Sequence, residues 1–177
     1  QSSQSELAAR STAILDKIGE RVRLTSAAGI VPGGIAAPAN TSTIDFQRGV
    51  GFLNGAIVWG PPERIAFQYT AADPDDGVDN DGDGLIDEGR VVHIENPGLP
   101  GQRVRVLGEW VREALEGEIP GNAVDDNGNG LVDEAGLSFD VDKDRINVWL
   151  TIERPGPDGN NVIETTRRTF AFRNRTP

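Results

Sequence analysis

The sequence predicts an α+β fold in which a long N-terminal helix packs on antiparallel β-sheet. One helical pattern opens the chain, and short runs that alternate apolar and polar residues follow it. Turn signals rich in Gly, Pro, Asn and Asp separate these runs, so we expect short connections and antiparallel pairing. The 177 residues suit a single domain, 1–177, with a substantial core.

Residues 5–28 are expected to form the helix. An apolar stripe is formed by Leu7, Ile14, Ile18 and Val22. Their spacings of seven, four and four residues place them on one face of a helix. Charged residues occupy many of the other positions. The helix is therefore expected to lie against the sheet on one side and to face water on the other.

The region from residue 40 to residue 177 is expected to be mainly antiparallel β. The alternation is clearest in RINVWLTIE, where the apolar residues from Ile146 to Ile152 share one face. The segment EWVREALEGEIP is alternatively interpreted as a short helix. The predicted strands are residues 43–47, 56–60, 64–70, 90–96, 103–111, 136–142, 145–153 and 164–174.

The negative charge is concentrated in two windows. The formal net charge is −11, and residues 73–88 hold eight acids while residues 125–134 hold four. Neither window contains Lys or Arg, and without these twelve acids the chain would carry +1. The acidity therefore belongs to two local sites, and no nucleic-acid-binding surface is predicted.

The composition excludes several kinds of chemistry. The absence of Cys excludes disulfides, thiolate zinc sites and thiol nucleophiles, and a single histidine excludes multi-histidine metal centres. His93 lies in an alternating run and is interpreted as a strand residue. No Ser-His-Asp or G-x-S-x-G arrangement is present, so we predict that the protein is not an enzyme. No apolar run reaches the about 20 residues of a membrane-spanning helix.

The two acidic windows contain the same phrase. The pattern D-x-[DN]-G-[DN]-G-L-[IV]-D-E begins at Asp79 and again at Asp125. Oxygen ligands at alternate positions of a tight, Gly-containing loop are how a chain surrounds calcium, which takes six to eight oxygens. Asn, Asp and Gly also dominate ordinary turns, but two copies in phase favour metal binding over that interpretation.

Two calcium ions are therefore expected, one in each phrase. Side chains would supply ligands at positions one, three, five, nine and ten, and a backbone carbonyl at position seven. Position twelve, which in an EF-hand is a bidentate glutamate, is Arg90 in the first loop and Gly136 in the second. The glutamates at position ten are expected to replace it. The predicted metal ligands are Asp79, Asp81, Asp83, Leu85, Asp87 and Glu88 in the first loop, and Asp125, Asn127, Asn129, Leu131, Asp133 and Glu134 in the second.

Both loops lie between predicted strands and not between helices, which favours a permanent structural site over a calcium-triggered switch. Ile86 and Val132, at position eight, are expected to point inward and fix each loop to the core. The second loop has two Asn where the first has Asp, so we expect it to bind calcium more weakly.

Three segments also carry a family resemblance. ELAARSTAILDKIGERVRLTSAAG is similar to the exposed half of a pilin helix, and RVRVLGEWV resembles a mid-chain segment that precedes an F-x-F-type strand. RINVWLTIE with TTRRTFAFRNR resembles a closing hairpin that ends in an apolar residue followed by Arg-Asn. In these respects the sequence resembles type IV pilin-like proteins, in particular the J-type minor pseudopilins of type II secretion and the W-type minor pilins.

The resemblance implies that residues 1–177 are a pilin-like head domain of a non-enzymatic subunit at or near the tip of a pilus or pseudopilus. Other subunits would contact its N-terminal helix and sheet edges. The full-length protein would carry a leader and an inner-membrane anchor before Gln1, with this domain on the periplasmic or extracellular face.

The alternative function is a secreted calcium-dependent adhesive or carbohydrate-binding β-domain, for which exposed tryptophans near the loops would be evidence. An extracellular hydrolase fits the sequence poorly.

Overall fold

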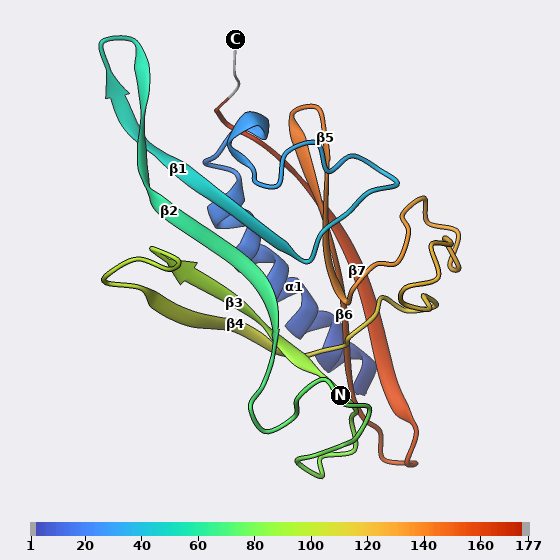
Figure 1. Cartoon of the computed structure of the whole chain (residues 1–177). Helices are drawn as coiled ribbons and strands as arrows, with labels where there is room; N and C mark the ends of the chain where they lie inside the picture. The colour runs from blue at the N-terminus through green and yellow to red at the C-terminus, as the bar shows by residue number, and fades with distance from the viewer. Residues whose placement is uncertain (1–2, 175–177) are drawn as a thin grey trace.

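The computed structural model describes residues 3–174. This part of the chain contains one α-helix, α1 (Ser3–Val22), one 3-10 turn, η1 (Ala27–Gly29), and seven strands (Figure 1). The strands are β1 (Thr43–Leu53), β2 (Ala56–Tyr69), β3 (Gly89–Glu95), β4 (Arg103–Val111), β5 (Leu137–Asp142), β6 (Arg145–Pro155) and β7 (Asn161–Ala171).

The predicted fold class, α+β with a long N-terminal helix packed on antiparallel sheet, is wrong. Antiparallel β-structure dominates the described residues: those in strands and isolated bridges account for 42% and those in helices for only 13%. Pairing between strands, and not contact with a long helix, therefore organises most of the described chain.

The helix is shorter than predicted because the backbone carbonyls that follow it form hydrogen bonds with distant segments of the chain. α1 ends at Val22, before the end expected from the sequence. Just beyond it, the Arg23 carbonyl accepts a hydrogen bond from the Arg173 amide at 2.7 Å, and the Leu24 carbonyl accepts one from the Gly49 amide at 2.8 Å. These carbonyls thus bond to distant segments and do not continue the helical ladder.

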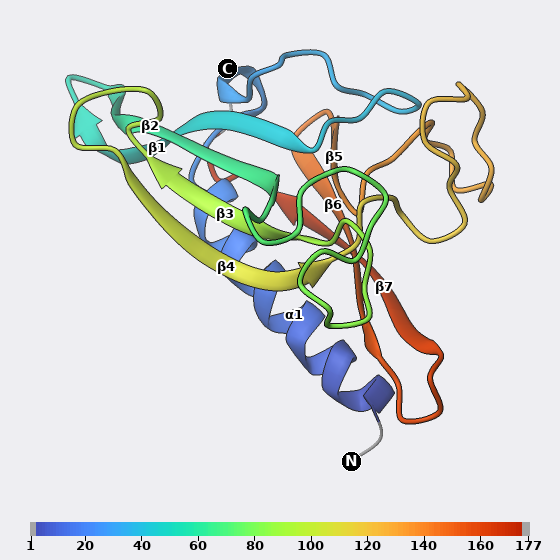
Figure 2. The same ribbon diagram turned by 60° about the horizontal axis from the view of Figure 1, so that its bottom comes forward.

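The strands pair in the order β1-β2-β3-β4-β6-β5, and β7 pairs with β6 beside this path. All of the pairings are antiparallel. β4 and β6 share a single paired position, Val111 with Ile152, so the sheet divides into one group of β1–β4 and another of β5–β7. α1 contacts strands of both groups (Figures 1 and 2).

Two predicted strands on either side of Pro61 and Pro62 form one strand, β2. β2 pairs with β3 only from Glu63 onward, and its register with β1 shifts after Gln47. The prolines therefore lie where β2 has no β3 partner and where its pairing with β1 is irregular. The backbone N–H groups that proline lacks cost few hydrogen bonds at such a place. The segment alternatively interpreted as a helix, residues 109–120, contains none.

The core lies between α1 and the strands. The apolar stripe predicted on the helix is confirmed, since all four of its residues are buried. On β6, the apolar residues predicted to share one face are buried as well. These side chains belong to one cluster, which includes Leu7, Ile14, Ile18, Val22, Phe139, Ile146, Val148, Leu150, Ile152 and Phe170.

Three segments of the chain meet where the two strand groups join. The Arg112 amide donates to the Thr151 carbonyl at 3.0 Å, and the Thr151 amide donates to the Gly136 carbonyl at 2.7 Å. The Gly136 amide in turn donates to the Glu113 carbonyl at 2.9 Å. We call these four residues the sheet junction. A Cβ added to Gly136 would lie 1.9 Å from the Arg112 carbonyl oxygen, so this position has room only for glycine.

Replacing Gly136 with alanine is expected to lower the free energy of unfolding by about 1–3 kcal/mol, because backbone at the junction must move to accept the methyl group. Gly51→Ala is the matched control: a Cβ there meets nothing within 4 Å. The control should change stability by no more than about 0.5 kcal/mol. Urea unfolding followed by tryptophan fluorescence measures both, and equal effects would contradict the role assigned to Gly136.

Candidate metal site

Two acidic loops connect the strands. Acidic loop 1 (residues 70–88) joins β2 to β3, and acidic loop 2 (residues 112–136) joins β4 to β5. They are the long irregular connections drawn in green and in gold in Figures 1 and 2. Each contains one copy of the repeated phrase.

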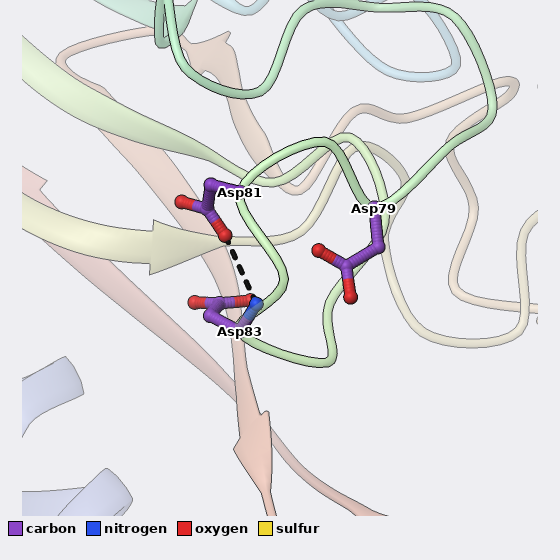
Figure 3. Close-up of side chains that lie close together, drawn as sticks. All are labelled: Asp79, Asp81 and Asp83. Carbon is purple, nitrogen blue, oxygen red and sulfur yellow. Dashed lines mark hydrogen bonds between the residues drawn. The ribbon is translucent and has the colours of Figure 1, made fainter.

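Acidic loop 1 gathers three carboxylates. One oxygen each from Asp79, Asp81 and Asp83 lies within 4.8 Å of the others. Within residues 3–174 this is the one group of three or more acidic, His or Cys side chains that could hold a metal ion. Figure 3 shows Asp79 across the loop from Asp81 and Asp83, with the Asp83 amide donating to Asp81 Oδ1 at 3.1 Å.

The anchors of the loops differ from those predicted. Leu85 and Leu131 are buried, whereas Ile86 is 56% exposed and Val132 is only partly buried. The expectation that the position-eight residues point inward is therefore wrong. In each loop the glycine before this pair and the aspartate after it have positive φ, and these two bends bring the leucine to the core instead.

Two of the predicted ligands serve to close the loops. The Asp87 carboxylate accepts hydrogen bonds from the backbone amides of Asp76 and Gly77, at 3.0 and 2.8 Å. Asp133 accepts bonds from two successive amides of acidic loop 2 in the same way. Neither residue belongs to the group of three carboxylates.

Two acids are buried together at the root of acidic loop 1. Glu88 is 6% exposed, and the fully buried Asp73 accepts hydrogen bonds from the amides of Asn80 and Glu88, at 2.9 and 3.2 Å. These amides hold the pKa of Asp73 below its usual value, while burial and the adjacent Asp73 carboxyl raise the pKa of Glu88 to about 8. Glu88 Oε2 is buried without a hydrogen-bond partner.

Glu88 borders the same space as the exposed cluster. A cavity of about 170 Å³ is lined by Asp81, Asp83 and Glu88, and also by Glu109 and Trp110. Glu88 is not one of the three clustered carboxylates, so its expected role as a replacement for the position-twelve ligand stays a prediction. Asp73 was not predicted, because it precedes the repeated phrase and only its place in the acidic window marks it.

Acidic loop 2 repeats the turn of acidic loop 1 without its carboxylate group. Asp125 accepts hydrogen bonds from the Gly128 and Gly130 amides at 2.6 and 2.9 Å, as Asp79 does in the first loop. Asn127 and Asn129 stand where the first loop has acids. The phrase itself therefore brings fewer carboxylates together here.

A second pair of buried acids lies at the root of acidic loop 2. Glu134 is 1% and Glu118 is 8% exposed, and Oε2 of each is buried without a hydrogen-bond partner. Asn129 Nδ2 donates to Glu134, and the Asn127 amide donates to Glu118 Oε1 at 3.0 Å. Burial, together with the neighbouring Glu118, raises the pKa of Glu134. The sequence did not identify Glu118.

His93 lies on strand β3, as predicted, and is buried. Its Nε2 is 2.6 Å from Glu63 Oε2, and Arg48 pairs with the other Glu63 oxygen. Burial alone would raise the pKa of Glu63, but hydrogen bonds from His93 and Arg48 lower it below its usual value. These three residues form a hydrogen-bonded network that joins β1, β2 and β3.

The sequence matches none of the known protein-family models, and comparisons with curated proteins and with solved structures also give no match. Among the described residues, no helix is long and apolar enough to cross a membrane.

In calcium-free buffer, we expect the Glu88→Gln variant to gain stability relative to the parent protein as the pH rises. The pKa of Glu88 is higher in the folded protein than its ordinary value of 4.5. The stability that the protonated Glu88 side chain contributes is therefore fully present below pH 4.5 and is lost as the pH rises toward about 8. Glutamine does not ionise, so the difference in melting temperature should grow between pH 5 and about pH 8. A difference that stays constant across this range would contradict the assignment.

Proposed function

We propose that this protein is a non-enzymatic structural subunit of an extracytoplasmic filament of the type IV pilin or pseudopilin class, and that calcium stabilises its acidic loops. The observation that carries the proposal is an exposed apolar surface on the β1–β2 hairpin. Such a surface suits a protein that assembles with partners.

The β1–β2 hairpin projects beyond the other strands (Figure 1, upper left). Phe52 is 73%, Leu53 is 66% and Val50 is 65% exposed, and Val58 and Trp59 on the adjoining strand are also exposed. We call these five residues the hairpin patch. The register places Phe52 and Trp59 on one face of the hairpin and Leu53 and Val58 on the other. Large apolar side chains on both faces of a projecting hairpin have no role in the core of this chain, which favours contact with another subunit.

The class of filament is proposed from the sequence resemblance, and the fold brings the segments that carry it together. The Arg173 amide donates to the Arg23 carbonyl at 2.7 Å, and Asn174 Nδ2 donates to the Leu24 carbonyl. The Arg-Asn ending thus contacts the chain just after α1. Phe172 is buried beside it in the core.

Calcium is proposed from the chemistry of acidic loop 1. The candidate ligands are oxygens alone. Three of them, Asp81, Asp83 and Glu88, line a small cavity together with a further acid, Glu109. Calcium prefers oxygen ligands and tolerates irregular geometry, whereas magnesium demands a near-octahedral set. An affinity of about 10⁻⁴–10⁻³ M would suit an extracellular structural site.

The alternative of a carbohydrate-binding domain is less well supported. Trp110 and Trp149 do line cavities beside the two loops, as that function would require. However, the guanidinium of Arg10 lies 3.6 Å from the centre of the Trp110 ring, and that of Arg167 lies 4.8 Å from the Trp149 ring. One face of each ring is therefore already occupied by a cation–π contact.

Calcium is expected to raise the melting temperature by about 5–10 °C at 100 times the dissociation constant, which corresponds to about 2.7 kcal/mol. Part of this rise in melting temperature comes from acidic loop 1. The Asp81→Asn variant should lose most of that part. Glu20→Gln removes the same charge from an exposed position on α1 and should leave the rise unchanged. Thermal unfolding with calcium and with chelator measures the effect, and no rise in the parent protein would contradict calcium binding.

A photo-crosslinking residue placed at Phe52 in the full-length protein is expected to capture another filament subunit in cells of the native host. The same residue at the exposed Asp158, in the β6–β7 turn, serves as the control. Mass spectrometry identifies the captured protein. Equal capture at both positions, or no filament protein among the products, would contradict the assembly role of the hairpin patch.

The class of filament has a separate test in the gene sequence before Gln1. A leader of the Gly-Phe-Thr-x-x-Glu type followed by about 20 apolar residues would support the pilin class. A secretion signal ending in an A-x-A cleavage site would rule the pilin class out.

A further inference from the structure

We propose that Glu118, which lies outside the repeated phrase, completes a second calcium site by acting with Glu134 at the root of acidic loop 2. This inference rests on the calcium binding proposed above. It adds a ligand that the phrase does not contain, and it gives acidic loop 2 the paired carboxylates that its asparagines fail to provide.

The first argument is the cost of burying these two side chains as they stand. Glu118 and Glu134 are each more than nine-tenths buried, and Oε2 of each has no hydrogen-bond partner. A buried carboxylate oxygen without a partner is strongly destabilising, and two neighbouring carboxylates repel one another as well. The nearest basic residue in the sequence, Arg112, lines a cavity with Glu118 but pairs with Glu153 at 3.8 Å, and no other Lys or Arg occurs between it and Lys143. A bound divalent cation would satisfy both carboxylates at once.

The second argument is that both loops contain this arrangement. In acidic loop 1, Asp73 comes from before the phrase, accepts the amide of Asn80 and neighbours the position-ten Glu88. In acidic loop 2, Glu118 also precedes the phrase. It accepts a hydrogen bond from the Asn127 amide and lies beside Glu134, the position-ten glutamate. The two acids do not align when the phrases are placed in phase, which is why the sequence pattern did not reveal them.

The position of Glu118 gives the site a structural consequence. The Glu118 amide donates to the Leu115 carbonyl at 3.1 Å, and the Leu115 amide donates to the Glu134 carbonyl at 2.9 Å. Glu134 is two residues before Gly136, which belongs to the sheet junction. A cation held by Glu118 and Glu134 would therefore tie together the two ends of acidic loop 2 and brace the junction.

Calcium titration of the purified chain by isothermal calorimetry tests the proposal. The parent protein is expected to bind two ions, Asp81→Asn to lose the site in acidic loop 1, and Glu118→Gln to weaken the other site at least ten-fold. In chelator, Glu118→Gln should melt at a higher temperature than the parent, because it relieves repulsion between carboxylates. Glu20→Gln is the control, because Glu20 is exposed on α1 and its substitution should change neither property.

Two ions bound equally by the parent and by Glu118→Gln would overturn this inference while leaving the proposed function intact. A single bound ion that is lost only in the Asp81→Asn variant would also overturn this inference and leave the proposed function intact. If the parent protein binds no calcium, both this inference and the calcium part of the proposed function are contradicted. If Glu118→Gln fails to fold, anomalous scattering from parent crystals grown with calcium decides the question. An ion about 2.3–2.6 Å from a Glu118 oxygen supports the proposal, and its absence there overturns it.

Discussion

The narrow contact between β4 and β6 is the constraint on which the rest of the fold depends. One paired position, Val111 with Ile152, joins the two strand groups, and the sheet junction supplies the main-chain hydrogen bonds around it. The approach is so close that Gly136 has no room for a side chain. Acidic loop 2 leaves and re-enters the sheet at this junction. The conformation of the loop and the contact between the two strand groups therefore depend on each other.

Burial of acids at the roots of both loops follows from this architecture. The carboxylates of Asp81 and Asp83 are exposed to solvent, and that of the partly exposed Asp79 accepts two backbone amide hydrogen bonds, so these three groups cost little on their own. Glu88, Glu118 and Glu134 are buried where the loops meet the sheet, and each has an oxygen without a partner. A cation at each root would turn these destabilising groups into ligands, so that the acidic loops would brace the sheet.

The proposed partner surface lies far from the loops. β2 runs from the hairpin patch at one end to acidic loop 1 at the other, and its 14 residues span about 46 Å. A stabilised region and an apolar projection at opposite ends of one strand suit a subunit that must stay rigid while it holds a neighbour. The network of His93 with Glu63 and Arg48 links the three strands between these ends.

The local features follow from the amino-acid sequence alone: the helix stripe, most strand positions, the repeated phrase and its three clustered aspartates. These depend on periodicity and on short-range turn chemistry, which neighbouring residues specify. Tertiary contacts set the point where α1 ends, bring the two leucines of the loops into the core, and bury Asp73 and Glu118 beside the position-ten glutamates. They also make β6 a central strand whose polar Asn147 and Thr151 are buried too. Each of these depends on contacts between segments far apart in the chain, and no local pattern records such contacts.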